Sequence, residues 1–159
     1  MSVSVQQEAF DVAAEMAALT AGDHRVGALA SFVGLVRDLN EGEAVHRMTL
    51  EHYPGMTERA LEDIVTEAGR RWSLLKVRVI HRYGPLAPGD AIVLVLVAGA
   101  HRGETFAACE FIMDYLKTQA PFWKKEVGLA GADQARWVDA RETDEQAAAR
   151  WVTSSRGGA

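Results

Sequence analysis

The chain has 159 residues, of which 48% are hydrophobic and 25% charged, so it can bury the core of one domain without disulfides or a structural metal. Its net charge of −5 argues against a nucleic-acid coat, because such proteins need an excess of basic residues. The longest apolar run, residues 91–100, is too short to span a membrane, and residues 1–10 do not resemble a signal peptide. We therefore expect a cytoplasmic protein.

The N-terminal part alternates between strand and helix patterns. Residues 3–22 predict a short strand followed by a helix that ends at a glycine. Residues 27–36 and 46–53 have the patterns of two strands, and residues 37–42 between them are turn-prone. A hairpin is the simplest pairing for these two strands.

The middle of the chain continues this alternation. Thr57 is predicted to cap an amphipathic helix that ends near Arg71. Residues 74–83 predict a half-exposed strand, residues 84–90 a turn, and residues 91–97 a central strand. The order of the elements predicts an α+β fold.

A long apolar segment follows at residues 106–116. Its side chains are apolar on nearly every side, which predicts a core helix that is buried all round and begins near Glu104 or Thr105. Lys117 lies in the last turn, where a lysine often only complements the helix dipole. Pro121 then prevents the helix from continuing.

The C-terminal part has weaker patterns. Residues 128–135 are expected to form a mobile loop and residues 136–138 a short strand. Thr143 or Asp144 is expected to cap a final helix that runs through Trp151.

Cations gather at the ends of the predicted elements: Arg37, His101, Arg102, Lys117, Lys124 and Lys125. In an antiparallel sheet these ends can converge. His101 and Arg102 precede a helix N-terminus, which favours anions, and arginine suits phosphate. Solvated turns explain Arg37, His101 and Arg102 about equally well, and a solvated face is the more common explanation for a lysine pair. These patterns alone indicate an α+β domain that binds a phosphorylated or carboxylated ligand.

Other kinds of site have little support in the sequence. The histidines lack metal-ligand spacing and no cysteine pair is present, so we expect no metal. Cys109 lies among apolar neighbours and is interpreted as a buried, inert thiol. No dinucleotide or phosphate-loop motif occurs, and we expect no cofactor.

Several long segments resemble the large, catalytic subunit of molybdopterin synthase. They read LEHYPGMTE at 50–58, VIHRYGPLAPGD at 79–90, AHR at 100–102, FIMDYLKTQAPFWKKE at 111–126 and RWVDAR at 136–141. The resemblance runs from about Val26 to Trp151, which is most of the chain. The chain length fits a single domain, which we place at residues 1–152, and the tail at 153–159 is expected to be disordered. The resemblance implies an α/β hammerhead-like fold whose mostly antiparallel sheet is covered by helices.

The resemblance also implies a function in molybdenum cofactor biosynthesis. The large subunit forms a homodimer, and each copy binds one small ubiquitin-like sulfur-carrier subunit with a Gly-Gly C-terminus, giving a heterotetramer. The enzyme is a sulfurtransferase, which moves two sulfurs from the carrier's thiocarboxylate to cyclic pyranopterin monophosphate and so forms the dithiolene of molybdopterin.

The resemblance assigns roles to individual residues. Lys117 and Lys124 match the catalytic lysines, and we expect Lys117 to act as an acid/base or transient covalent group. The matching substrate-binding positions are Leu35, Val36, Arg37, His101, Arg102, Lys117, Lys124, Lys125 and Glu126. The loop at 128–134 is longer than the family pattern predicts, which weakens the assignment of Lys125 and Glu126. One alternative is a non-catalytic dimer that docks a ubiquitin-like partner or binds a phosphorylated metabolite, and another is a phosphate-ester enzyme that uses the same cations without sulfur.

Overall fold

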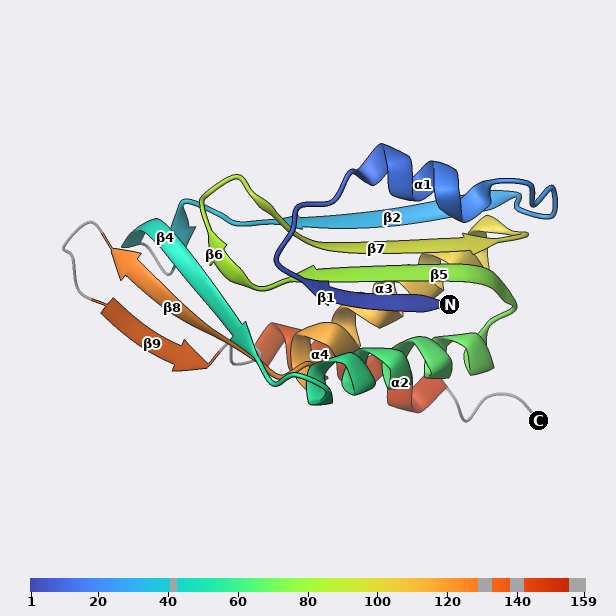
Figure 1. The fold of residues 1–159 in the computed structure, drawn as a ribbon. Coiled ribbons are helices and arrows are strands. Elements are labelled where there is room, and N and C mark those ends of the chain that lie inside the picture. Colours follow the sequence, from blue (N-terminus) through green and yellow to red (C-terminus); the bar gives the residue numbers. More distant parts are fainter. Residues whose placement is uncertain (41–42, 129–132, 138–141, 155–159) are drawn as a thin grey trace.

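The computed structural model describes residues 1–40, 43–128, 133–137 and 142–154. Figure 1 shows the course of the chain. The elements in order are β1 (Ser2–Gln6), α1 (Val12–Thr20), β2 (Ala28–Leu35), β3 (Leu39–Asn40), β4 (Glu43–His52), α2 (Met56–Arg71), β5 (Leu74–Arg82), β6 (Gly84–Leu86), β7 (Ala91–Gly99), α3 (Arg102–Gln119), β8 (Phe122–Gly128), β9 (Asp133–Trp137) and α4 (Glu142–Ser154). The predicted α+β class is confirmed.

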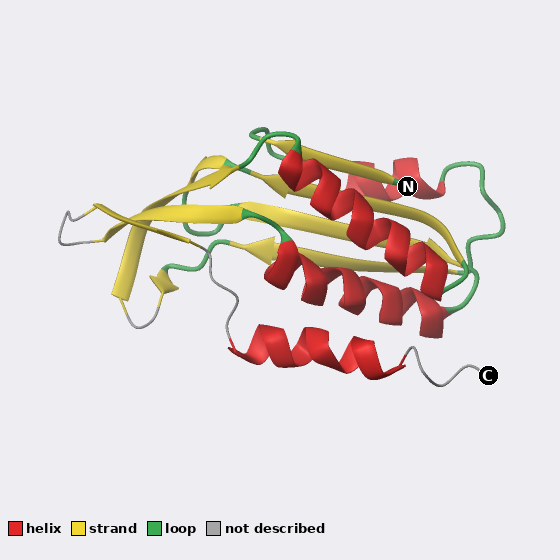
Figure 2. Cartoon of the chain, turned by 90° about the horizontal axis from the view of Figure 1, so that it is seen from below, coloured by secondary structure: helices red, strands yellow, loops and turns green. Residues whose placement is uncertain are grey.

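The first sheet forms the middle layer of the molecule. Its strand order is β1-β5-β7-β2, in which β1 is parallel to β5 and the other pairs are antiparallel. Alternate side chains of β7 point to opposite faces, so Val95 packs with α2 and α3 while Leu94 and Leu96 pack with α1. Figure 2 shows α2 and α3 side by side across one face. The central strand is therefore buried on both faces, as its apolar run predicts.

A second sheet extends from one end of the first. Its order is β3-β4-β8-β9. The short strand β6 also pairs with β4, on the edge opposite β8. The buried residues at this end form an apolar cluster, which we call the junction cluster: Val36, Met48, Leu50, Leu86 and Phe122. Full burial of one such side chain contributes about 1.5–3 kcal/mol, so the burial of Phe122 of β8 with Met48 and Leu50 of β4 stabilises the pairing of these two strands.

The strand pairing differs from the expected hairpin. β2 pairs with β7, and β4 pairs with β8, so the strands predicted at 27–36 and 46–53 lie in different sheets. Alternation of apolar side chains indicates which face of a strand is buried, but it does not name the partner strand. Short strands also occupy part of the predicted turn at 84–90 and of the predicted loops at 37–42 and 128–135, as β6, β3 and β9.

The first turn of α2 corrects the predicted cap. Gly55 precedes the helix with a φ of 82°, and its N–H donates to the Glu58 carboxylate at 2.6 Å. Thr57 is instead buried inside the helix, where its hydroxyl donates to the carbonyl of Pro121 at 3.4 Å. The residue predicted to start α2 therefore connects it to the start of β8.

Helix α3 is less enclosed than its composition predicts. It begins at Arg102, two or three residues before the predicted start, and Phe106 is 65% exposed. Its buried side chains are Thr105, Ala108, Cys109, Phe111, Ile112, Met113 and Leu116. The exposed stripe carries Phe106 and Glu110, so the helix is buried on most sides and not all round.

Helix α4 packs on the outside of α3. The indole N–H of Trp151 donates to the Asp114 carboxylate at 2.8 Å, and its ring meets that of Phe111 edge-on at 5.6 Å. The helix begins at Glu142, so Thr143 and Asp144 lie within it instead of capping it. It continues to Ser154, which makes residues 153–154 of the predicted tail helical, while 155–159 lie outside the described residues.

Candidate active site

Lys117 and Lys124 lie on the two sides of one turn. Lys117 is exposed in the last turn of α3, and Lys124 is half-buried near the start of β8. The turn at Ala120 and Pro121 is hydrogen-bonded to α2, because the buried Thr57 hydroxyl donates to the Pro121 carbonyl. Both lysines therefore project from regular elements that are fixed against the core.

Phe122 anchors the strand that carries Lys124. It is 4% exposed in the junction cluster, and it lies opposite His52 of β4, while Lys124 lies opposite Leu50. Residues two apart on a strand share a face, so Lys124 emerges on the side of the buried Leu50 and Phe122. The stem of Lys124 thus starts beside an apolar cluster.

The end of β2 reaches the same cluster. Val36 is 8% exposed within it, and the backbone N–H of Val36 donates to the Asp90 carbonyl at 2.9 Å. Its neighbours Leu35 and Arg37 are exposed. The structure therefore brings Leu35, Val36 and Arg37 to the end of the molecule that carries the two lysines.

His101 and Arg102 lie at the other end of the first sheet. Both are exposed, where β7 has ended and α3 begins. Arg102 and Lys117 are fifteen residues apart on one helix, which separates their Cα atoms by about 22 Å at 1.5 Å per residue. The cations at the element ends therefore do not all converge within a single chain, because α3 separates Arg102 from Lys117.

The remaining two candidates are placed only by their backbone. Lys125 pairs with Thr49 and Glu126 with Met48 along β8. Their side chains lie outside the described residues, so their assignment to the substrate site stays a prediction.

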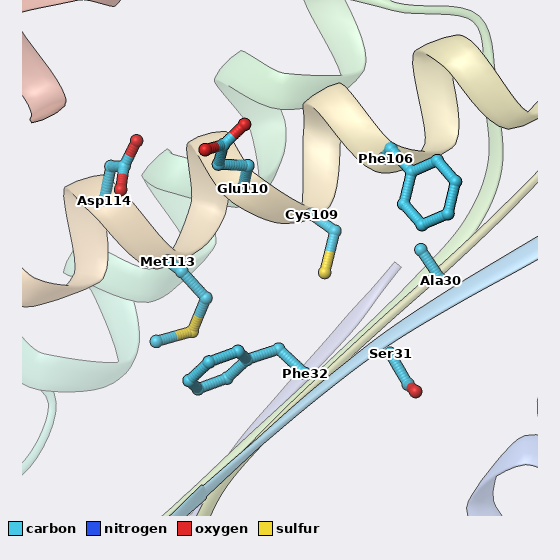
Figure 3. A pocket seen from close by; sticks show the side chains of 8 residues that line it. All are labelled: Ala30, Ser31, Phe32, Phe106, Cys109, Glu110, Met113 and Asp114. Carbon is cyan, nitrogen blue, oxygen red and sulfur yellow. The ribbon is translucent and has the colours of Figure 1, made fainter.

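A hollow of about 400 Å³ lies between β2 and α3, and two residues of its lining, Met113 and Asp114, lie one helical turn before Lys117. It is lined by Ala30, Ser31, Phe32, Phe106, Cys109, Glu110, Met113 and Asp114. Figure 3 shows Phe32, Cys109 and Met113 converging from the two elements. Burial, and secondarily the charge of Glu110, raises the pKa of Cys109 to about 11, which supports an inert thiol. Two carboxylates make this hollow unsuited to an anionic substrate.

Sequence reasoning missed His81 of β5, which packs against Phe122 at the start of the strand that carries Lys124. Its ring is 6% exposed and stacks on Phe122 with centroids 3.8 Å apart. The signal was present in the strand pattern, because His81 continues the inward face of Val77 and Val79. The half-exposed strand pattern by itself predicts only that His81 belongs to a strand.

Within the described part of the chain, no group of three or more His, Cys, Asp or Glu side chains is arranged to hold a metal ion. No helix among these residues is long and apolar enough to cross a membrane.

The fold and the site define a class: an α+β protein that presents two lysines at the junction of a core helix and a second sheet. Residues 5–119 match the profile of the family described as MoaE protein. The chain belongs to the MoaE protein family.

Known proteins resemble it over nearly its whole length. The molybdopterin synthase catalytic subunit of Ralstonia nicotianae is 62% identical over 150 residues, which cover 94% of this chain and 84% of that one. The solved structure of the molybdopterin biosynthesis MoaE protein from Burkholderia ambifaria has a TM-score of 0.81 and 56% identity, covering 95% and 97% of the two chains. The molybdopterin synthase structure from Staphylococcus aureus has a TM-score of 0.74 and 28% identity, covering 84% and 93%.

Proposed function

We propose that this chain is the catalytic subunit of a molybdopterin synthase. It would transfer two sulfurs from the thiocarboxylated C-terminus of a small ubiquitin-like carrier to cyclic pyranopterin monophosphate, forming the dithiolene. The observation that carries the proposal is the placement of Lys117 and Lys124 on the two sides of one turn, in a chain 62% identical to a molybdopterin synthase catalytic subunit. The reaction class is sulfur transfer.

The two lysines suit complementary roles. Attack by a thiocarboxylate, loss of water and ring opening require protons to be moved close to the reacting carbon. Lys117 is exposed at a helix end and is assigned the acid/base or transient covalent role. Lys124 emerges beside an apolar cluster, where its ammonium orients the thiocarboxylate or stabilises charge on its carbonyl oxygen. Arg37, at the same end, is assigned to the substrate phosphate.

His101 and Arg102 require a second copy of the chain. Because one helix length separates Arg102 from Lys117, a single chain does not bring both to one small substrate. The homodimer implied by the family resemblance removes this difficulty if the start of α3 in one copy meets the end of α3 in the other. We assign His101 and Arg102 to the substrate site of the partner copy.

Dithiolene formation from cyclic pyranopterin monophosphate and thiocarboxylated carrier tests the activity. Lys117→Ala is expected to lower the rate by about 100-fold to 10,000-fold, the usual range for a lost acid/base group. Lys76→Ala is the matched control, because Lys76 lies in β5 and pairs with Asp23 at 3.8 Å. Full activity in Lys117→Ala, or no product from the unaltered chain, would contradict the proposal. A non-catalytic docking protein would bind the carrier and give no product.

Mixing two inactive variants tests the shared site. If Arg102 acts in the partner's site, random dimers of Lys117→Ala and Arg102→Ala chains regain about a quarter of the activity, because half of the C2 dimers hold one intact site. If the mixture stays inactive while both variants fold and dimerise, Arg102 does not act across the dimer.

A further inference from the structure

His81 is a buried titratable side chain that the proposed chemistry does not use. It lies on β5, and its ring stacks on Phe122 with centroids 3.8 Å apart and an interplanar angle of 20°. Its Nδ1 is 2.9 Å from the backbone carbonyl oxygen of Arg82. A carbonyl oxygen can only accept, so Nδ1 carries the proton and donates it to this bond. The hydrogen bond satisfies the buried N–H of His81, while the face of the ring is what contacts Phe122.

A second imidazole approaches the same phenylalanine from β4. His52 is the cross-strand partner of Phe122, with ring centroids 6.2 Å apart, and it lies 4.4 Å from the ring of Tyr83. Its buried Nδ1 makes no hydrogen bond in the described part of the chain. The start of β8 is therefore packed against aromatic rings from both sheets, with His81 making the closest contact.

The His81 ring is uncharged at neutral pH. Burial lowers the pKa of His81 to about 4; the Arg82 carbonyl opposes this, and the charges of Lys117 and His52 add to the lowering. Lys117 thus lies within electrostatic reach of the ring. A neutral aromatic ring at this point supports the start of β8 without placing another cation beside the lysines.

We propose that His81 is a positioning residue for sulfur transfer: its ring holds Phe122, and with it the segment of β8 that carries Lys124, at a fixed place relative to Lys117. This inference rests on the proposed function. Phe122 and Lys124 are two residues apart on one strand face, so a shift of the phenylalanine ring moves the origin of the lysine side chain. Misplacement of a reacting group by 1 Å can cost about 100-fold in rate.

Two substitutions separate this role from ordinary packing. His81→Phe keeps a flat ring against Phe122 but loses the hydrogen bond to Arg82, and His81→Leu keeps apolar volume without a ring. His24→Leu is the matched control, because His24 is exposed in the loop between α1 and β2. His81→Gln is a second ringless variant for use if His81→Leu does not fold.

The rate measurement uses the chain assembled with thiocarboxylated carrier. We expect kcat to fall about 10-fold to 100-fold in His81→Leu with KM for the pterin within about twofold, and His81→Phe to retain kcat within about threefold. A purely structural role lowers Tm in both variants and leaves kcat of the folded fraction unchanged. Unchanged kcat in His81→Leu, or equal losses in His81→Leu and His81→Phe, would overturn the inference.

Backbone amide hydrogen exchange at 122–124 gives a readout that does not depend on turnover. Faster exchange is expected at these positions in His81→Leu, with wild-type protection in His81→Phe and His24→Leu. Unchanged protection in His81→Leu refutes the positioning role. If the unaltered chain forms no dithiolene, the proposed function fails, and the exchange data still decide whether His81 fixes the start of β8.

Discussion

Burial of His81 makes the stability of the fold sensitive to mild acid. The pKa of His81 falls from 6.5 to about 4 on folding, chiefly because burial disfavours the charged ring. The unfolded chain therefore binds a proton that the folded chain does not between these two values. In that interval the free energy of unfolding decreases by about 1.4 kcal/mol for each unit that the pH falls, which amounts to about 3 kcal/mol from pH 7 to pH 4. Below the folded-state pKa both states are protonated and the loss stops.

His81→Phe removes this contribution because the side chain no longer titrates. Urea unfolding followed by tryptophan fluorescence, at half-unit steps from pH 7 to pH 4 and constant ionic strength, measures the free energy at each pH. From pH 7 to pH 4, the free energy of unfolding is expected to fall by about 3 kcal/mol more in the wild type than in His81→Phe. His24→Leu, at an exposed site, should follow the wild type. Parallel curves for wild type and His81→Phe would refute the assignment of His81 as a buried neutral ring.

Two further predictions concern stability, each measured by urea unfolding. Gly27→Ala places a Cβ against the backbone carbonyl that follows β7 and should destabilise the fold by about 1–3 kcal/mol. Gly103→Ala places its Cβ in open space within α3 and should stabilise the fold by up to about 1 kcal/mol. Equal effects of the two substitutions would contradict the close approach at Gly27. Trp151→Phe removes the 2.8 Å hydrogen bond to Asp114 and should lower the free energy of unfolding by about 1–2 kcal/mol. Val152→Ala, at an exposed position, should change this free energy little. An unchanged free energy of unfolding in Trp151→Phe would show that this bond does not hold α4.

The type of each long element could be predicted from the sequence. The apolar run of β7 indicated a strand covered on both faces, and the structure places helices on both sides of it. The alternation at residues 46–53 indicated a strand, and β4 covers all but the last of these residues. These predictions succeed because they depend only on local periodicity.

Strand pairing and the arrangement of the site depend on contacts that periodicity does not encode. The register that places Phe122 opposite His52 joins segments seventy residues apart, and the pattern of β4 fits several partners equally well. The sequence marked Arg102 and Lys117 as cations at element ends, but their separation depends on the direction in which α3 crosses the sheet. His81 was overlooked because its neighbours in space, Phe122 and Lys117, come from two later elements.

The turn between α3 and β8 also has a consequence for folding kinetics. Lys117 and Lys124 are only seven residues apart, so they resemble a local motif. The residues packed around the start of β8, however, come from β4, β5, β6 and the residue that follows β2. Chain closure over such separations is slow compared with helix formation, so α3 can form well before the lysine site exists. During refolding, helical circular dichroism should therefore recover earlier than sulfur transfer, and an isolated fragment of residues 102–128 should contain both lysines without their site.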